Sequence, residues 1–280
     1  MLPLILRLAI PSMLAQLVNV LYSIVDRIFI SKMSDGDLAL AGVGVCGPIV
    51  TLITSFSYLM GLGGAPLLAM KMGEGDRKSG ERILFNCFVM LVAISALLTV
   101  GFMIFKRQLL FAFGASGESI TYADEYMTIY ALGSVFALLS VGLNSFITAQ
   151  GFSATAMLTV VIGAVTNVAL DPLFIFVLHL GIRGAALATV LSQLIVLLWQ
   201  FKLFSNPNEL IHLRRDTYRL ERRIVTGSLS IGLSPFLINL CACLVVIIIN
   251  KQLVSYGGDV AVGAYGIANR MMFFFVMVVI

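Results

Sequence analysis

Hydrophobic residues run along this chain in long stretches that short polar segments separate. An α-helix rises about 1.5 Å per residue, so about 20 apolar residues cross the roughly 30 Å hydrocarbon core of a bilayer. One stretch, 39–70, is longer than a crossing needs and contains Gly47-Pro48, which predicts a tilted or kinked helix. The pattern predicts eight membrane-spanning helices, over residues 8–31, 39–70, 83–105, 126–148, 155–179, 184–204, 224–250 and 260–280.

Composition supports a membrane protein. Of the 280 residues, 60% are hydrophobic and 11% are charged, and the mean hydropathy is +1.03, which excludes an ordinary soluble domain. We expect an all-α integral membrane protein with no soluble catalytic domain, and therefore not an enzyme. The cysteines form no disulfide or metal pattern and all lie in apolar stretches, with the last two on different sides of one helix: Cys46, Cys87, Cys241 and Cys243.

Basic residues in the short loops predict the orientation. With the amino end in the cytoplasm, eleven basic residues fall on the inner side and five on the outer side. The richest basic stretch, HLRRDTYRLERR at 212–223, fits a cytoplasmic loop touching anionic headgroups, so the net charge of +4 requires no nucleic-acid partner. We expect a multi-pass protein of the cell (inner) membrane, in contact with its lipids, with the amino terminus inside.

Two carboxylates interrupt the apolar stretches at depth, Asp26 in the first and Asp171 in the fifth. An Asp at the centre of a membrane helix costs about 2.5–3.5 kcal/mol on insertion scales, so two of them indicate an ion or proton site. Asn167 precedes Asp171 by four residues and shares its helix face, where it offers an amide oxygen beside the carboxylate. Counted along the predicted helices, Asp26, Asp171 and Thr189 all lie in the outer part of the bilayer and can meet at one level.

Both carboxylates also have a simpler interpretation. Asp26 precedes Arg27, and the two can pair near the outer interface. Asp171 precedes Pro172 and can satisfy backbone groups that are freed at a kink. We favour a functional role, because the apolar run continues beyond Asp26 and because Asn167 lies one turn from Asp171.

A ten-residue segment occurs twice. GDLALAGVGV at 36–45 matches GDVAVGAYGI at 258–267 with four identities. Ten small and apolar residues can match by chance, but each copy follows a span and a short polar loop. The offset covers six spans, an even number, so both copies enter the membrane in the same orientation, as in transporters built from two similar halves. Residues 1–205 then form an amino-terminal six-helix lobe, 206–223 a basic cytoplasmic loop, and 224–280 the first two helices of a truncated second lobe.

Four segments together resemble the multidrug and toxic compound extrusion (MATE) transporters: AIPSMLAQLVNVLYSIVDRIFIS, ALAGVGVCGPI, NVALDPLFIF and GIRGAALATVLSQ in the first, second, fifth and sixth predicted helices. The resemblance covers the whole chain. It implies twelve helices in two pseudosymmetric lobes around a central cavity, of which this sequence holds eight, a MATE-like six-helix lobe and the start of the second. It also implies export of organic cations and other drugs against a proton or sodium gradient. We expect a monomer that needs no cofactor besides the coupling ion.

The resemblance also assigns roles to residues. It implies ion coupling, and a possible sodium site, at Asp26, Asn167, Asp171 and Thr189, and a hinge in the first helix at Pro11. Oxygen ligands of this kind suit a hard cation or a shared proton. From the residues alone, Thr189 supports close helix packing and Pro11 is a first-turn proline, so these two assignments rest on the resemblance.

The seventh predicted helix departs from the family pattern. Some members carry a glutamate there as part of a second ion site, but IGLSPFLINLCACLVV has Ile238 and Asn239 around that position. The repeat agrees, because it aligns Asp26 with Ile248. We therefore expect the ion site in the amino-terminal lobe.

The sequence thus predicts a secondary active multidrug efflux transporter that exports organic cations and other amphipathic drugs by antiport with protons or sodium, through alternating access. A lipid-linked oligosaccharide flippase of the same superfamily is the alternative. A flippase needs basic residues in its cavity to bind pyrophosphate, and only Arg27, Arg270 and Lys202 lie within predicted spans. A channel or an intramembrane enzyme is disfavoured, because the spans contain no selectivity-filter motif and no paired-His metal motif.

Overall fold

The structure, a computed structural model, describes residues 2–33, 35–115, 117, 119–205, 211 and 220–279. These residues are helical apart from short turns, which confirms the all-α prediction. Most of the predicted loop 206–223 lies outside the described residues. The elements are α1 (Leu2–Ser31), α2 (Gly36–Gly73), α3 (Arg77–Ala112), α4 (Ile120–Ala149), α5 (Ser153–Pro172), the π-helix η1 (Leu173–Val177), α6 (Ile182–Phe204) and α7 (Arg222–Val279).

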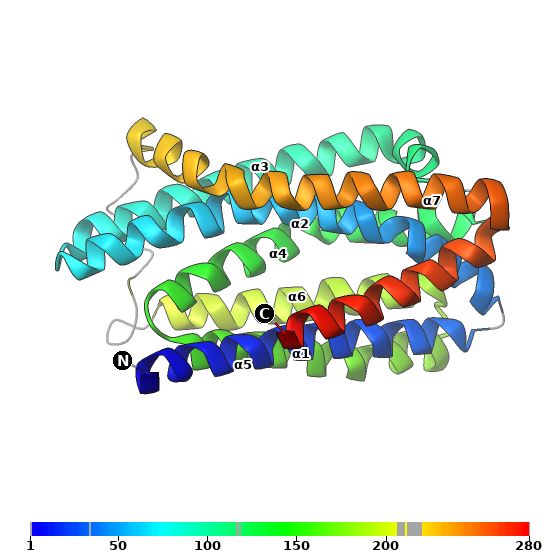
Figure 1. The fold of residues 1–280 in the computed structure, drawn as a ribbon, viewed down its shortest axis with the longest axis horizontal. Coiled ribbons are helices and arrows are strands. Elements are labelled where there is room, and N and C mark those ends of the chain that lie inside the picture. The colour runs from blue at the N-terminus through cyan, green and yellow to red at the C-terminus, as the bar shows by residue number, and fades with distance from the viewer. Residues whose placement is uncertain are drawn as a thin grey trace.

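Seven helices in the described part of the chain are long and apolar enough to cross a membrane. The seventh of these spans ends at Gly258, where φ is 65° and ψ is −167°, a backbone conformation that glycine adopts readily. Beyond this kink α7 continues as a second helical segment, here called the return segment (259–279), which turns back beside α1 in Figure 1. The return segment occupies the place of the eighth predicted helix and follows Gly258, which is equivalent in the repeat to Gly36, the first residue of α2.

Successive helices run in alternating directions along the long axis of the bundle (Figure 1). α4 is central, because it contacts α2, α3, α5 and α6, while α1 packs on α5 and α2 packs on α7. Buried apolar side chains such as Ile53 and Leu138 fill one half of the bundle, and Met60 and Phe146 lie in the other half. α5 in turn contacts α1, α4 and α6.

Small residues permit the close contact of α2 with α7. A methyl group on Gly63 would collide with the backbone oxygen of Ser228, and one on Gly232 would collide with the backbone oxygen of Leu59. Glycines of this kind let helix backbones approach in a membrane, where no hydrophobic effect drives the helices together. The crossing is therefore set by backbone contact rather than by large side chains.

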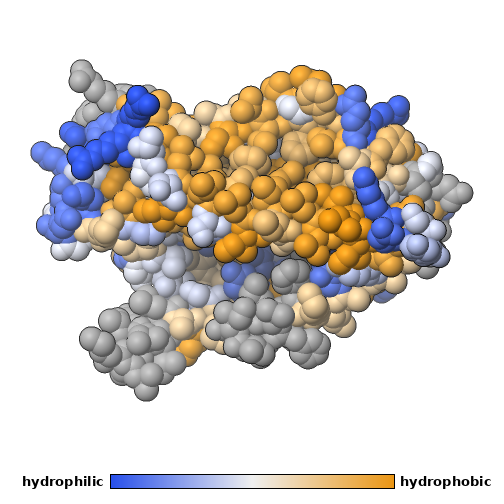
Figure 2. Space-filling view, turned by 45° about the horizontal axis from the view of Figure 1, so that its top comes forward, coloured by the Kyte–Doolittle hydropathy of each residue, from blue (hydrophilic) through white to orange (hydrophobic). Residues whose placement is uncertain are grey.

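The outer surface fits a lipid environment. Hydrophobic side chains form a broad band between two hydrophilic ends in Figure 2. Large apolar residues such as Leu97, Val165 and Leu198 are well exposed on different helices. A band of this extent would not stay dispersed in water, and it identifies a multi-pass membrane protein.

Ion pairs connect helices at the two polar ends. Arg82 of α3 pairs with Glu221, just before α7, at 3.4 Å, and Arg183 of α6 pairs with Glu125 of α4 at 2.8 Å. Lys71, near the end of α2, lies at the same end as Arg82. The end of the bundle that carries Lys71 and Arg82 is the one that the sequence predicts to be cytoplasmic. The orientation itself stays a prediction.

The structure tests two interpretations that were made from the sequence. Pro11 lies well inside α1, so the first-turn interpretation is wrong, whereas its role as a hinge stays a prediction. Cys241 is exposed while Cys243 is buried and donates from Sγ to the oxygen of Pro48 at 3.1 Å. The prediction that these two cysteines point to different sides of their helix is confirmed.

Candidate ion-coupling site

Helix α5 carries two of the predicted site residues on one buried face. Asn167 is 1% exposed and Asp171 is 0% exposed. Nδ2 of Asn167 donates to Oδ1 of Asp171 at 3.4 Å, the contact that a spacing of four residues in a helix allows. The carboxyl group therefore lies inside the protein rather than at the lipid surface.

The helix changes its form directly after Asp171. Pro172 has no backbone N–H, and the next residues form the π-helix η1, in which the N–H of Leu178 donates to the oxygen of Leu173 at 2.9 Å. The Asp171 side chain contacts Asn167 and does not bond the backbone freed at Pro172 in the described structure. The interpretation of Asp171 as a simple kink residue is therefore not supported.

Helix α6 brings Thr189 to the same place. Gly184 packs against the carbonyl group of Phe174 in η1, where a methyl group would come within 2.8 Å of the oxygen. Five residues further along α6, Oγ1 of Thr189 accepts from Nδ2 of Asn167 at 3.4 Å and donates to the oxygen of Ala185 at 3.0 Å. The glycine thus sets the approach of α6 that places Thr189 beside α5.

Helix α1 supplies the second carboxylate. Asp26 is half-buried, and its side chain lies close enough to that of Asp171 to interact with it electrostatically. Two ionised carboxylates offer only acceptors, and Oδ2 of Asp171 has no donor among the described residues. A proton on either group supplies the donor between them. The structure therefore brings Asp26, Asn167, Asp171 and Thr189 together, as the sequence predicts.

Asn167 differs from the expectation in its orientation. The amide nitrogen, not the oxygen, faces Asp171 and Thr189, and Oδ1 is buried with no hydrogen-bond partner in the described structure. Both neighbours offer acceptor oxygens, so the amide presents its donor side to them. A half-turn of the amide would present its oxygen to a bound ion.

Tyr126 of α4 belongs to the site, although the sequence did not single it out. Its side chain is buried, hydrogen-bonds with Thr189 and lies close enough to Asp26 to interact electrostatically. Its ring stacks on that of Tyr130, with centroids 6.2 Å apart. The signal available in the sequence was this pair of tyrosines four residues apart on one helix face.

Arg27, the cation that follows Asp26 in the sequence, is buried. Arg27 is 8% exposed, and its guanidinium lies near Gly47 of α2 and Gly266 of the return segment. Arg27 is thus packed between helices, and its pairing with Asp26 near the outer interface stays a prediction.

The chemistry of the site suits a hard cation or a proton. Within the described residues no group of three or more His, Cys, Asp or Glu is arranged to hold a metal ion. The site instead offers two carboxyl groups, an amide and a hydroxyl, which are ligands that suit Na⁺ or H⁺ rather than a transition metal. Sodium at these four residues stays a prediction.

The first part of α7 has no comparable site. Ile238 is 68% exposed, and Nδ2 of Asn239 donates to the oxygen of Pro235 in its own helix at 2.9 Å. The amide is thus used locally, and the stretch around it contains no carboxylate. This arrangement agrees with an ion site in the amino-terminal lobe.

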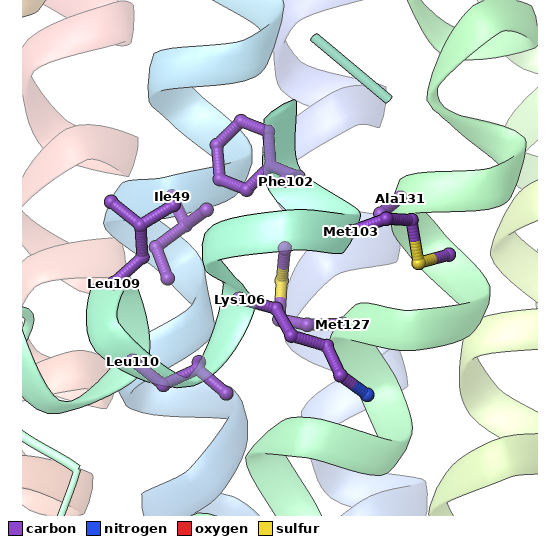
Figure 3. Close-up of a pocket in the computed structure, with 8 residues that line it drawn as sticks. All are labelled: Ile49, Phe102, Met103, Lys106, Leu109, Leu110, Met127 and Ala131. Atoms are coloured by element: carbon purple, nitrogen blue, oxygen red, sulfur yellow. The ribbon is translucent and has the colours of Figure 1, made fainter. Parts of the chain in front are cut away.

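A small cavity lies between α2, α3 and α4 (Figure 3). Its volume is about 10 Å³, which leaves room for a single water molecule. Lys106, at its edge, bends toward α4, where it pairs with Asp124 and donates to Oγ1 of Thr128 at 2.9 Å. The cavity is too small to bind a drug.

Comparison with known proteins identifies the family. The MatE family model matches residues 11–173. Multidrug export protein MepA of Staphylococcus haemolyticus is 28% identical over 267 residues, and that of Staphylococcus aureus is 23% identical over 266 residues. Each of these two alignments covers 95% of this chain and 58% of the relative.

Solved structures agree with the sequence match. The solved structure of the MATE multidrug transporter DinF-BH superposes with a TM-score of 0.93 at 31% identity, over 98% of this chain and 61% of that protein. This chain therefore spans about three-fifths of the length of the relatives it matches. It belongs to the MatE family, the multidrug and toxic compound extrusion transporters.

Proposed function

We propose that the complete protein is a secondary active antiporter that exports organic cations and other amphipathic drugs through alternating access, driven by H⁺ or Na⁺. The ion binds at Asp26, Asn167, Asp171 and Thr189. The protein acts as a monomer in the cell membrane, with its amino terminus in the cytoplasm, and needs no cofactor besides the coupling ion. Relatives named as multidrug export proteins support the transport class.

The observation that carries the proposal is the acceptor-rich pair of carboxyl groups, of which Asp171 is buried and Asp26 half-buried. Oδ2 of Asp171 has no donor among the described residues, and Asp26 is the group beside it. Two ionised carboxylates about 4 Å apart repel by about 4 kcal/mol at an effective dielectric constant of about 20. A bound cation or proton removes this repulsion, so the site favours occupancy.

Antiport requires that ion and drug favour different states of the transporter. Neutralising the pair changes the charge and the hydrogen bonds between α1 and α5, and α1 then bends at Pro11 or shifts against α5. Drug is released outward in the ion-bound state and is bound again from the inside once the ion has left. The free energy of the ion gradient is thereby used to export drug.

The flippase alternative has less support. A pyrophosphate headgroup needs accessible cations, but Arg27 is buried between helices and Lys202 lies near the end of α6. The side chain of Arg270 lies outside the described residues. A drug antiporter fits the carboxylate-rich site better, because carboxylates attract cations and repel phosphates.

Efflux of a fluorescent organic cation from cells that express the complete gene tests the proposal. The proton and sodium gradients are collapsed separately, each time with the wild type and with Asp171→Asn at matched membrane abundance. Loss of efflux on collapse of one gradient, together with loss in the variant, is expected and names the ion. Wild-type efflux that is indifferent to both gradients would refute antiport, and the absence of any efflux would favour the flippase.

A further inference from the structure

A second cavity opens at one polar end of the bundle, where α2 ends and α3 and α7 begin. Its volume is about 680 Å³, within the range of roughly 300–1,000 Å³ that small-ligand pockets occupy. In Figure 2 hydrophilic residues gather at this end, at the left, directly beside the hydrophobic band. It is the end that the sequence predicts to be cytoplasmic.

Close packing of three helices closes the cavity toward the membrane. A methyl group on Gly63 of α2 would collide with the backbone oxygen of Ser228 of α7, and Sγ of Cys87 of α3 lies 3.4 Å from Oγ of Ser228. The three helices therefore meet at Ser228. The cavity lies directly beyond this point, between the last two turns of α2, the first two turns of α3 and the start of α7.

Part of the lining is apolar. It consists of Leu67 and Met70 of α2, Ile83 of α3 and Ile224 of α7. Leu67 and Met70 are three residues apart and so share one face of their helix, and Met70 is 56% exposed. A small inorganic ion gains nothing from such a wall, whereas the carbon atoms of an amphipathic ligand are removed from water there.

Three cations, one from each helix, complete the lining: Lys71, Arg82 and Arg223. Lys71 pairs with Glu74 at 2.6 Å and Arg82 pairs with Glu221 at 3.4 Å, while Arg223 forms no ion pair in the described part of the chain. Arg223 lies close enough to Lys71 for the two positive charges to act on each other. An anion bound between them relieves this repulsion and connects α2 with α7.

We propose that this cavity binds an anionic phospholipid, with its phosphate at Lys71 and Arg223 and its glycerol and acyl carbons against Leu67, Met70 and Ile224. Basic groups beside an apolar wall, at the edge of the hydrocarbon band, match the chemistry of such a lipid. Free phosphate offers a similar charge but makes no use of the apolar wall. The bound lipid ties the end of α2 to the start of α7, and its binding does not depend on the proposed antiport.

The test titrates the complete protein, purified and delipidated in detergent, with phosphatidylglycerol. Native mass spectrometry measures the Kd of the first lipid bound. Phosphatidylcholine, which carries the same phosphate but no net charge, is titrated alongside, and both titrations are repeated in a large excess of inorganic phosphate. The wild type is expected to bind phosphatidylglycerol at least about tenfold more tightly than phosphatidylcholine, and to keep it in the excess of phosphate.

Variants locate the binding in the cavity. Arg223→Gln is expected to weaken phosphatidylglycerol binding about fivefold, and Lys71→Gln/Arg223→Gln more than about tenfold. Arg223→Lys keeps the charge and should stay within about twofold of wild type. Lys78→Gln is the matched control, because Lys78 is exposed at the same end of the bundle and does not line the cavity. It should bind the lipid as the wild type does.

Three results would overturn the proposal. The first is equal affinity of the wild type for the two lipids. The second is equal weakening by Lys78→Gln and Arg223→Gln, the sign of general surface charge. The third is displacement of phosphatidylglycerol by inorganic phosphate, which would identify a site for free phosphate. If the double variant does not purify as a folded protein, Arg223→Gln and Arg223→Lys decide, because Arg223 is exposed.

Discussion

Asp26 and Asp171 interact side chain to side chain across the contact between α1 and α5. Asn167 engages Oδ1 of Asp171, which leaves Oδ2 directed to the neighbouring carboxyl group or to an ion. The charge of this pair therefore depends on what occupies it, and α1 and α5 are the elements that respond.

Replacing Asp171 by Asn keeps the size of the side chain but removes the charge. We expect Asp171→Asn to reach the membrane at wild-type abundance and to lose gradient-driven efflux by more than about tenfold, since the ion no longer has a pair to neutralise. Fluorescent efflux and quantitative blotting measure the two quantities. Glu125→Gln, which removes a carboxylate from a surface ion pair, is the control and should retain transport. Normal efflux by Asp171→Asn would exclude Asp171 from ion coupling.

Asn167 holds the site together through two bonds from one nitrogen. Asn167→Ala removes the donor to Asp171 and Thr189, at a cost of about 1.5–3 kcal/mol for a bond to a charged group. We expect the apparent affinity for the coupling ion to fall about tenfold. Efflux rates measured against ion concentration give this affinity. Asn239→Ala is the matched control, because that amide bonds its own helix, and an equal effect in both variants would contradict the role of Asn167.

Tyr126 contributes its hydroxyl group through Thr189. Tyr126→Phe keeps the ring stacked on Tyr130 but loses the hydrogen bond, worth about 0.5–1.5 kcal/mol. A roughly two- to tenfold weakening of the apparent ion affinity is expected, measured as for Asn167. Tyr130→Phe also preserves the stacked pair and leaves the bond to Thr189 intact, so it should behave as wild type. If Tyr126→Phe and Tyr130→Phe had the same apparent ion affinity, Tyr126 would have no part in the site.

The contact of α2 with α7 should depend on Gly63. Gly63→Ala forces a methyl group against the oxygen of Ser228, and overpacking of this kind costs about 1–3 kcal/mol. A fall in Tm of roughly 2–12 °C follows for a protein of this size. Fluorescence-detected size-exclusion chromatography after heating measures this fall in Tm. Gly101→Ala on α3, where a methyl group meets no atom within 4 Å, should leave Tm unchanged, and an unchanged Tm in Gly63→Ala would contradict the close packing.

Much of the fold follows from hydropathy alone, because a bilayer requires long apolar helices. Most of the predicted spans fall within the helices observed, but the fifth, 155–179, runs past Val177, where η1 ends. The two copies of the repeat begin at Gly36, the first residue of α2, and at Gly258, where α7 kinks before the return segment. The polar ends of the helices extend further than hydropathy indicates. The first-turn interpretation of Pro11 failed because α1 begins at Leu2, before the predicted span, and apolar periodicity does not fix where a helix begins.

The candidate site was partly predictable. Spacing placed Asn167 and Asp171 on one face, and depth along the helices allowed Asp26 and Thr189 to join them. Rotation of one helix against another depends on packing, such as that of Gly184 on Phe174, and a single sequence does not reveal it. The buried position of Arg27 and the inclusion of Tyr126 were not predictable for the same reason.

The most direct test of the central claim counts the ions that drug binding displaces. Calorimetric titration of the purified complete protein, in buffers of different ionisation enthalpy, counts protons released per drug bound, and displacement of radioactive sodium counts Na⁺. We predict release of about one ion per drug from the wild type, and none from the Asp26→Asn/Asp171→Asn double variant at equal drug occupancy. Undiminished ion release from the double variant would contradict the assignment of this site.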